Sequence, residues 1–359
     1  MKALANGKAV VAMSGGVDSS LAAALMVEQG WDTIGVTLKL LARADTGFGC
    51  CGSPVDIDDA KRVCETLGIP HYTLNLSEIF EDKVIKPFID AYLSSRTPNP
   101  CVECNRSLKF GYLLALVNAW GAQCLATGHY ARVENSRLYR AKDGEKDQTY
   151  FLYSLTAKEL EKTRFPIGEL TKTEVRARAR ALKLKTADKP ESQEICFVPR
   201  KDYRGFIESR AGADGAGLSE GPIEDSSGNL LGRHTGLASY TIGQRKGFKL
   251  AHTPSQAVYV VDIKTEANTL VVGPSSETFG GRFTAEAVSW ASDRPTGPIA
   301  ASVRIRHRHP PAKAKITPLG PGEVEVEFEE PQRAVTPGQA AVFYRGDEVL
   351  GGGTISGKL

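Results

Sequence analysis

The first 130 residues alternate short apolar runs with stretches of helical periodicity. The apolar runs lie at residues 8–13, 31–40, 71–76 and 123–127, and the helical patterns lie at 19–30, 55–67, 77–95 and 108–120. Each apolar run is short and is bounded by turn-forming or polar residues, which is typical of a buried strand. Strands that alternate with helices predict an α/β fold with a doubly wound parallel sheet. Ligands of such sheets bind at the carboxyl ends of the strands, where we expect Ser14, Gly128 and His129.

The pattern changes after about residue 203. Residues 211–236 are rich in glycine and predict a loop-rich link, and short strand patterns follow from Tyr240 onward. These patterns lie at residues 257–263, 269–272, 303–307, 324–328 and 341–344. Their spacing predicts a small β-rich central domain followed by a C-terminal β-barrel. We therefore expect three domains, at residues 1–203, 204–278 and 279–359.

Composition excludes several classes of protein but does not identify a partner. With 41% hydrophobic and 24% charged residues, the 359-residue chain is neither disordered, collagen-like nor a disulfide-dense scaffold. The net charge of +3 indicates no partner, so any nucleic-acid surface must be local. The apolar run 21–27 is too short for a membrane span, and no secretion signal accompanies the seven cysteines. We expect reduced thiols in a cytoplasmic protein without membrane attachment.

The segment Ser14-Gly15-Gly16-Val17-Asp18-Ser19-Ser20 joins the first predicted strand to the first helix. Glycines let backbone N–H groups approach a phosphate, and a helix N-terminus adds partial positive charge. The segment lacks both the Walker A ending and the dinucleotide fingerprint, and a tight turn with a serine cap is the plain alternative. It resembles the PP-loop of the N-type ATP pyrophosphatases, which split ATP into AMP and pyrophosphate. That resemblance implies that Asp18 helps to hold Mg²⁺ near the pyrophosphate.

Two cysteine segments stand apart from the other thiols. Residues 96–105 form a proline-punctuated loop that runs into a predicted helix, whose dipole would favour a thiolate. A second cysteine lies in Glu191-Ser-Gln-Glu-Ile-Cys-Phe197. A lone cysteine is usually a small buried apolar residue, and we interpret four thiols in that way. These are Cys50, Cys51, Cys64 and Cys124, of which the last two fall inside a predicted helix and strand.

Six motifs occur in a fixed order along nearly the whole chain. After the PP-loop come Thr-Pro-Asn-Pro-x-x-x-Cys-Asn (97–105), Thr-Gly-His-Tyr-Ala-Arg (127–132), Lys-Asp-Gln-x-Tyr-Phe-Leu (146–152), Ser-Gln-Glu-Ile-Cys-Phe (192–197) and Thr-Ile-Gly-Gln-Arg-Lys-Gly (241–247). Together they resemble the bacterial tRNA-specific 2-thiouridylase family. The resemblance implies ATP-dependent 2-thiolation of the tRNA wobble uridine. In that reaction the C2 oxygen is adenylated and sulfur from a protein persulfide displaces AMP.

The resemblance also implies roles for the cysteines. Cys104 matches the nucleophile and Cys196 the persulfide carrier, and the reaction would leave a Cys104–Cys196 disulfide for a reductant to reopen. The chain departs from the family at Cys101, where an aspartate is frequent. Because Cys101, Cys104 and Cys196 are three thiols, an iron–sulfur cluster with one open iron is an alternative cofactor.

The remaining implied contacts are with ATP and tRNA. The resemblance assigns ATP binding to Ala12, Met13, Ser14, Gly15, Gly16, Val17, Asp18, Ser19, Leu38 and Gly128. It assigns tRNA binding to Asn99, Pro100, Cys101, His129, Lys146, Asp147, Gln148, Arg306, His307 and Gln339. Without the motifs, His129 is a strand-end histidine and residues 146–148 are a polar surface loop. A stacked base cannot react, so the wobble uridine should be flipped into the pocket between the PP-loop and Cys104.

Two basic stretches favour RNA binding independently of the family. If residues 303–309 form a strand, Arg304, Arg306 and Arg308 share one face. A helix over residues 171–185, opened by the capping box of Thr171 and Glu174, presents further basic residues such as Arg176 and Arg180. A solvated face is the plain alternative for both, whereas arginines on phosphates would make binding sensitive to salt.

Two rival functions stay open at this point. One is another PP-loop enzyme that modifies tRNA, such as a cytidine thiolase or a lysidine synthetase, and the other is a tRNA-binding sulfur carrier without catalysis. The sequence does not identify the sulfur donor, which is either a sulfur-relay protein or a cysteine desulfurase. Nothing in the sequence demands more than a monomer.

Overall fold

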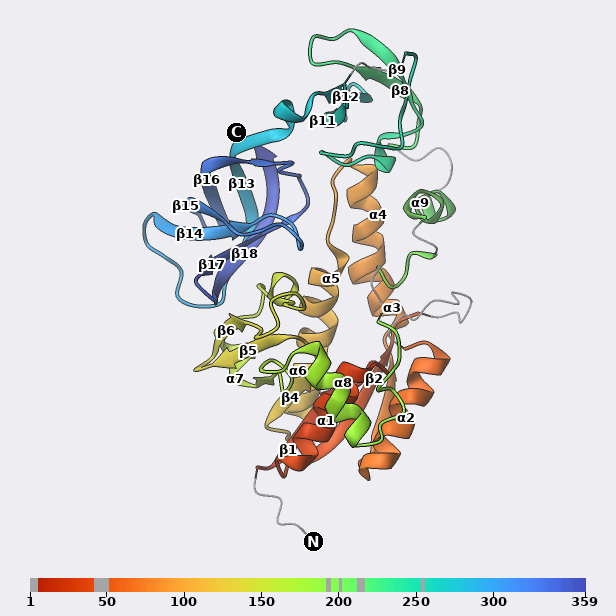
Figure 1. The fold of residues 1–359 in the computed structure, drawn as a ribbon, viewed down its shortest axis with the longest axis vertical. Coiled ribbons are helices and arrows are strands. Elements are labelled where there is room, and N and C mark those ends of the chain that lie inside the picture. Colours follow the sequence, from red (N-terminus) through yellow and green to blue (C-terminus); the bar gives the residue numbers. More distant parts are fainter. Residues whose placement is uncertain (1–5, 42–51, 192–194, 200–201, 212–216, 253–255) are drawn as a thin grey trace.

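The computed structural model describes residues 6–41, 52–191, 195–199, 202–211, 217–252 and 256–359. Cys50, Cys51 and residues 192–194 of the fifth motif lie outside the described residues. Figure 1 shows the first sheet and its helices at one end of the molecule, a small sheet at the other end, and a barrel beside the junction. No described helix is both long enough and apolar enough to span a membrane.

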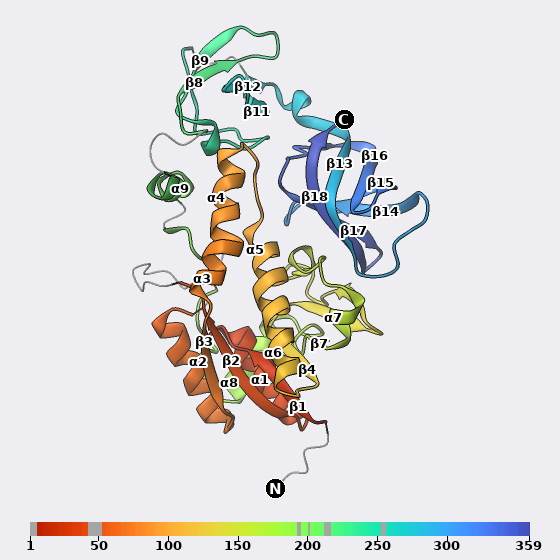
Figure 2. The same ribbon diagram turned by 180° about the vertical axis from the view of Figure 1, so that it is seen from behind.

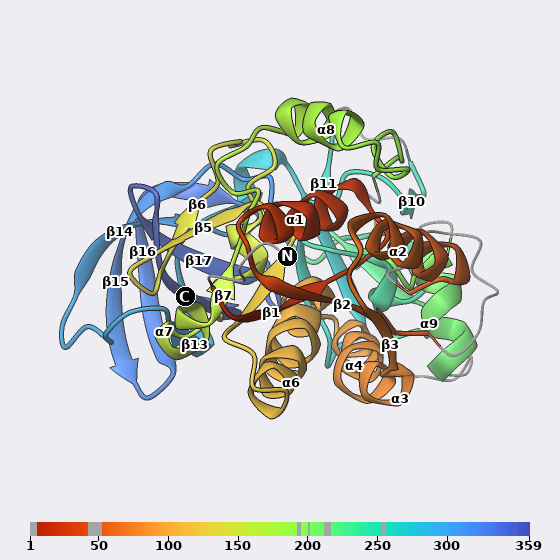
Figure 3. The ribbon, with the colours of Figure 1, turned by 90° about the horizontal axis from the view of Figure 1, so that it is seen from below.

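The N-terminal sheet has five parallel strands in the order β3-β2-β1-β4-β7. The strands are β1 (Lys8–Ala12), β2 (Asp32–Lys39), β3 (His71–Asn75), β4 (Cys124–Thr127) and β7 (Thr163–Arg164). Helices lie on both faces, with α1, α2 and α8 on one side and α3, α4 and α6 on the other (Figure 3). Because both faces are covered, the central strands read as continuous apolar runs. The predicted doubly wound parallel sheet is confirmed.

Helix ends in this part follow the local sequence. The N-terminal region contains α1 (Val17–Glu28), α2 (Pro54–Leu67) and α8 (Lys172–Ala181). Helix α2 starts after Ser53, whose hydroxyl accepts from the Asp56 N–H, and ends at Gly68 with φ of 67°. The capping box of Thr171 and Glu174 opens α8 as predicted, although the helix ends at Ala181 rather than near 185.

Two predicted helices differ from the structure in their limits. The helix expected at 77–95 is divided into α3 (Ser77–Phe80), a π-helical segment η1 (Glu81–Ile85) and α4 (Lys86–Leu93). Pro87 cannot donate to the preceding turn, which fits the irregular hydrogen bonding there. The helix expected at 108–120 begins at Pro100 and comprises α5 (Pro100–Glu103), the π-helical η2 (Cys104–Tyr112) and α6 (Leu113–Ala119). Cys104 therefore lies inside a helix rather than before one.

The central sheet has the order β10-β9-β8-β12-β11. Figure 2 shows β8, β9, β11 and β12 together at the end of the molecule away from the parallel sheet. Its strands are β8 (Gly221–Glu224), β9 (Leu230–His234), β10 (Lys249–Leu250), β11 (Tyr259–Lys264) and β12 (Thr269–Gly273). The expectation of a loop-rich link at 211–236 is thus wrong for its second half, where β8 and β9 form an antiparallel hairpin. The Asp225 carboxylate accepts from the backbone N–H groups of Ser227 and Asn229 and closes the turn.

The C-terminal strands form a closed antiparallel barrel, in which β13 pairs with both β16 and β18. The six strands are β13 (Phe279–Trp290), β14 (Ile299–Arg304), β15 (Ala312–Gly320), β16 (Glu323–Arg333), β17 (Ala340–Arg345) and β18 (Glu348–Lys358). Phe283, Val326 and Phe343 are fully buried inside it. The predicted β-barrel is confirmed, but the strand expected at 303–307 ends at Arg304.

A hairpin from the first half of the chain extends the barrel sheet. It consists of β5 (Ala131–Glu134) and β6 (Arg137–Arg140), and β6 pairs with β18 through Leu138 and Tyr139. The remaining helical elements are η3 (Thr149–Phe151), α7 (Ala157–Glu161), α9 (Tyr203–Ala211), η5 (Leu237–Ser239) and η6 (Ser275–Thr278). The hairpin directly follows β4, so it connects the barrel sheet to the carboxyl edge of the first sheet.

Candidate active site

A cavity of about 380 Å³ lies at the carboxyl edge of the parallel sheet, where β1 and β4 end. It brings together the PP-loop, the end of β4, the start of the helix that carries Cys104, and the segment that carries Cys196. Of the predicted ATP-binding residues, it is lined by Ala12, Met13, Ser14, Gly16, Val17, Asp18, Ser19, Leu38 and Gly128. Segments far apart in the sequence therefore share one site.

The PP-loop conformation depends on Gly15. Its φ of 71° is left-handed, and a Cβ at this position would lie 2.3 Å from the Asp56 carbonyl oxygen. The Ser19 and Ser20 hydroxyls both donate to the Gly16 carbonyl, at 3.1 and 2.8 Å. These bonds fold the loop onto the N-terminus of α1, which makes it suitable for an anion.

Gly128 lies against the same helix terminus. A Cβ on Gly128 would lie 2.5 Å from the Ser19 nitrogen and 2.6 Å from the Asp18 carbonyl carbon. Since those atoms are backbone, no side chain at position 128 could be accommodated without moving α1. The glycine therefore sets how closely the end of β4 approaches the PP-loop.

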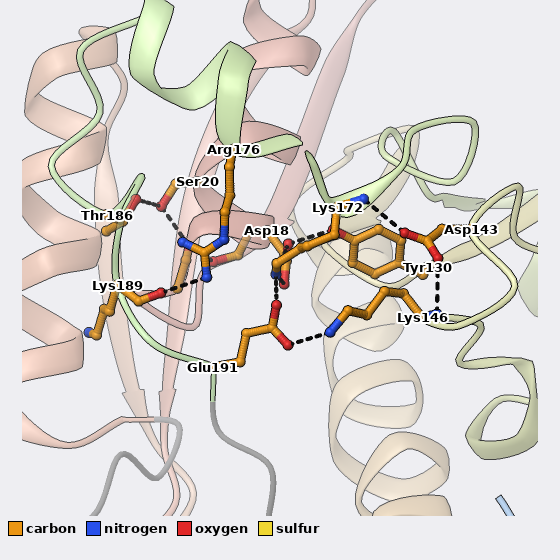
Figure 4. Close-up of polar contacts among 12 residues, drawn as sticks. Asp18, Ser20, Tyr130, Asp143, Lys146, Lys172, Arg176, Thr186, Lys189 and Glu191 are labelled. Atoms are coloured by element: carbon orange, nitrogen blue, oxygen red, sulfur yellow. Dashed lines mark hydrogen bonds and ion pairs between the residues drawn. The ribbon is translucent and has the colours of Figure 1, made fainter. Parts of the chain in front are cut away.

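Ion pairs inside the cavity include residues that sequence reasoning did not identify. The Lys172 ammonium lies 2.8 Å from both carboxylate oxygens of Asp18 and 2.8 Å from Glu191 Oε1 (Figure 4). Glu191 also accepts from Lys146 at 2.8 Å, and the Tyr130 hydroxyl donates to Asp18 at 2.9 Å. Burial raises the pKa of Glu191, but its hydrogen bonds to Lys146 and Lys172 outweigh this and lower it to about 2.

A second lysine, Lys189, also lines the cavity and holds the PP-loop. Lys189 Nζ donates to the Gly15 carbonyl at 3.0 Å and to Asp56 Oδ1 at 2.7 Å, and it also pairs with Asp59. Both carboxylates belong to α2, so Lys189 fastens the loop to that helix. No motif in the sequence marked Lys172 or Lys189. The only sequence signals were that Lys172 directly follows the capping threonine of α8 and that Lys189 lies shortly before the Cys196 segment.

The three candidate cysteines line the cavity together. Cys104 is buried, Cys196 is half-buried and Cys101 is exposed. Phe197, next to Cys196, packs edge-to-face against Phe88 with ring centroids 5.1 Å apart and so anchors the Cys196 segment. Within the described residues, no three His, Cys, Asp or Glu side chains are grouped so that they could hold a metal ion.

The other described thiols fit a structural role. Cys64 and Cys124 are fully buried in α2 and β4, as predicted. Burial raises the pKa of Cys64 to about 12 and that of Cys124 to about 11, so both stay protonated and unreactive at neutral pH.

Only some of the predicted tRNA-binding residues line the cavity. These are Pro100, Cys101, His129, Lys146 and Gln148. The Nδ1 atom of His129 is 2.8 Å from the Thr127 hydroxyl, and its ring lies beside Phe110 and Phe165. Burial, together with Lys109, lowers the pKa of His129 well below its usual value. The imidazole is therefore neutral at physiological pH.

Asp147 corrects the expectation that residues 146–148 all contact tRNA. Its side chain is fully buried. It accepts from the Thr149 hydroxyl at 2.9 Å and pairs with Arg304 at 3.2 Å and Arg140 at 3.5 Å. While Lys146 and Gln148 line the cavity, Asp147 lies among buried groups and has no surface to offer RNA. Its role is to join this loop to the barrel.

The arginine pattern at 304–308 also needs correction. Because β14 ends at Arg304, the three side chains do not share a strand face. Arg304 is buried and donates to the carbonyls of His307 and His309, Arg306 donates to the Arg333 carbonyl at 3.0 Å, and only Arg308 is exposed. The ring of His307 lies 4.6 Å from that of Phe151. The region is a packed corner with one exposed cation.

The basic helix is likewise partly structural. Arg176 donates to the carbonyls of Ala187 and Lys189, and Arg180 pairs with Asp188 at 2.6 Å. These arginines fix the segment that precedes Glu191 rather than forming a uniform RNA-binding face, and Figure 4 shows Arg176 directed toward that segment.

Two distant segments hold the loop that leads to Cys104. Gln339 Nε2 donates to the Thr97 carbonyl at 3.0 Å, and the Thr97 N–H donates to the Pro337 carbonyl at 2.9 Å. The Thr97 hydroxyl also lies 3.1 Å from that of Thr241, in the sixth motif. Asn99 directly precedes α5 within this loop. The barrel and the central sheet therefore both position the approach to Cys104.

A parallel sheet with a PP-loop at its carboxyl edge, and with paired thiols in the same cavity, defines an ATP-using enzyme of sulfur chemistry. Family models match three parts of the chain: a tRNA methyl transferase HUP domain at residues 7–200, a tRNA methyl transferase PRC-barrel domain at 213–274 and an aminomethyltransferase beta-barrel domain at 281–355. The chain is 47% identical to the tRNA-specific 2-thiouridylase MnmA of Carboxydothermus hydrogenoformans, over 100% of both chains. It is 48% identical to that of Heliobacterium modesticaldum, over 98% of this chain and 92% of the relative.

The chain belongs to the tRNA-specific 2-thiouridylase family. The predicted enzyme class, a tRNA-uridine sulfurtransferase that uses ATP, is thereby confirmed. Among solved structures, the NMN synthetase of Francisella tularensis matches 52% of this chain and 66% of its own, with 20% identity and a TM-score of 0.32.

Proposed function

We propose that the protein transfers sulfur to C2 of the tRNA wobble uridine in the cavity between the PP-loop and Cys104. The observation that carries this proposal is that one cavity is lined by the PP-loop, Cys104 and Cys196. ATP would lie with its phosphates at the N-terminus of α1, and the flipped uridine would lie beside Pro100 and Cys101.

The first chemical step activates the uridine. The C2 oxygen attacks the α-phosphorus of ATP, the bond to the β-phosphate breaks, and pyrophosphate leaves with the electron pair. The adenylated carbon then has AMP as a leaving group instead of an oxide. Asp18 would hold Mg²⁺, because its carboxylate lines the cavity beside the PP-loop and carboxylate oxygens are suitable ligands. Such an ion would neutralise negative charge at the phosphates.

The second step moves sulfur. The terminal sulfur of a persulfide on Cys196 attacks C2 and displaces AMP. The Cys104 thiolate then attacks the Cys196 sulfur, which releases 2-thiouridine and leaves a Cys104–Cys196 disulfide. A dithiol reductant reopens that disulfide with two electrons. The sulfur donor is a sulfur-relay protein or a cysteine desulfurase, since neither the cavity nor ATP supplies sulfane sulfur.

The same interpretation extends to the whole chain. The three domains would comprise residues 1–203, 204–278 and 279–359. The barrel, His129, Lys146 and Gln148 would hold the tRNA. The protein would work as a monomer in the cytoplasm, where its tRNA substrate is made. The bonds of Gln339 and Thr241 to Thr97 support a role for all three parts in the active site.

Variants of the three cysteines test the proposal. Anaerobically purified Cys101→Ser, Cys104→Ser and Cys196→Ser proteins are incubated with ATP, Mg²⁺, a sulfur donor and unmodified tRNA. We expect thiouridine from wild type and Cys101→Ser only, and an added sulfur on the Cys196 peptide of Cys104→Ser by mass spectrometry. Loss of activity in all three variants, with wild-type activity following iron content, would overturn the persulfide route in favour of a cluster.

A further inference from the structure

The residue that follows Cys104 belongs to the second motif, but neither the motif nor the sulfur chemistry gives it a role. Asn105 is 3% exposed and lies in the first turn of η2. Its Nδ2 donates to the Phe151 carbonyl at 3.0 Å. Its Oδ1 is buried and has no hydrogen-bond partner among the residues that the structure describes. A buried polar atom without a partner is destabilising, so this side chain calls for an explanation other than stability.

The partner of Asn105 belongs to a short element that the barrel holds in place. Phe151 is the last residue of η3. The Tyr150 hydroxyl, in the same element, donates to the carbonyl of Ala340 at the start of β17, at 2.9 Å. The centroid of the Phe151 ring lies 4.6 Å from that of His307, at the corner of the barrel. The barrel corner, η3 and the helix that carries Cys104 are therefore joined by direct contacts.

The conformation of the helix that carries Cys104 makes this contact consequential. The segment η2 is π-helical, so its hydrogen bonds join residues five apart instead of four. If it relaxed to a regular α-helix, the register would shift by one residue and the first turn would rotate relative to the rest. The bond from Asn105 to Phe151 opposes that rotation, because it holds the first turn to η3. The direction of the neighbouring Cys104 side chain thus depends on Asn105.

We propose that Asn105 is a positioning residue, which directs Cys104 at the Cys196 sulfur and ties it through Phe151 to the barrel corner. This rests on the proposed function, in which the Cys104 thiolate forms a bond to the Cys196 sulfur. The bond from Cys196 to the transferred sulfur breaks, and 2-thiouridine leaves with its electron pair. The earlier adenylation takes place at the PP-loop and does not use Cys104, so Asn105 acts on the second step alone.

Single-turnover kinetics separate the two steps. Asn105→Leu has a similar volume but carries no amide, and it is assayed with saturating ATP, Mg²⁺, tRNA and a sulfur donor. We expect pyrophosphate formation to stay within about threefold of wild type. Release of 2-thiouridine should be about tenfold slower or more, because a small misplacement of a reacting group is costly. The tRNA should then accumulate on the protein through the Cys196 sulfur, as a band on non-reducing denaturing gels.

Asn118→Leu is the matched control. Asn118 lies on α6, further along the same helical run, where it is exposed and accepts from Lys162 at 2.7 Å. The variant makes the same change of side chain away from η3, so both steps should proceed as in wild type.

A second variant tests the link without altering Asn105, and it also serves if Asn105→Leu does not fold. Phe151→Leu keeps the carbonyl that accepts from Asn105 but removes the ring that lies beside His307. At saturating tRNA it should slow thiouridine release about threefold or more, with pyrophosphate formation unchanged.

Equal slowing of both steps in Asn105→Leu would overturn the proposal, and so would thiouridine release at the wild-type rate in Asn105→Leu or in Phe151→Leu. Failure of the proposed function is distinct, since wild type itself would then form no thiouridine.

Discussion

At the residue scale, single backbone positions decide the shape of the nucleotide loop. Gly15 combines a left-handed φ with a carbonyl oxygen 2.3 Å from where a Cβ would lie. We predict that Gly15→Ala destabilises the protein by about 1–3 kcal/mol and lowers ATP-dependent turnover more than tenfold, because the loop must move. Urea unfolding and the rate of AMP release measure the two effects. Gly144→Ala, where nothing lies within 4 Å, should have little effect on either. Equal behaviour of the two variants would contradict this account.

Glu191 makes stability depend on pH in a defined direction. Its pKa is about 2 in the folded protein, below the ordinary value of 4.5. Its contribution to stability is therefore fully present above about pH 4.5 and is lost as the pH falls toward 2. We predict that the difference in unfolding free energy between wild type and Glu191→Gln shrinks between about pH 6 and pH 3. A difference independent of pH across this window would show that the carboxylate is not held as described.

At the element scale, the loop at 146–148 is fixed to the barrel by a buried ion pair. Arg304 ends β14 and meets Asp147, whose side chain is fully buried. We predict that Asp147→Ala costs about 3–5 kcal/mol, because Arg304 is left buried without its main partner. Breaking the exposed Asp82–Lys86 pair with Asp82→Asn should cost far less, because water screens an exposed ion pair. Denaturant titration compares them, and similar losses would show that Asp147 is not a structural residue.

These elements also show which structural features can be predicted from the sequence and which cannot. The parallel strands and the PP-loop were predictable because buried runs and the Ser-Gly-Gly pattern are local signals. The alternation of Arg304, Arg306 and Arg308 misled, since periodicity cannot reveal that β14 ends at Arg304. The roles of Asp147 and Lys172 were hidden for a related reason. Their partners lie 157 and 154 positions away in the chain, so only tertiary packing assigns them.

At the scale of the whole molecule, three parts converge on the approach to Cys104, and we propose that RNA binds across them. Arg308 is exposed on the corner of the barrel, whereas Arg304 is internal. We predict that Arg308→Gln weakens tRNA binding and lowers the slope of log affinity against log salt by about one. Filter binding at several salt concentrations measures this. The exposed Lys61→Gln on α2 is the control, and an unchanged slope for Arg308→Gln would remove this corner from the RNA surface.

The central claim is that this cavity converts uridine to 2-thiouridine at the cost of ATP. The most direct measurement incubates the protein with ATP, Mg²⁺, a sulfur donor and unmodified tRNA, and analyses the tRNA nucleosides by mass spectrometry alongside the AMP formed. We predict 2-thiouridine at the wobble position, with one AMP for each thiouridine. AMP formation without thiouridine, or thiouridine formed without ATP, would contradict the account.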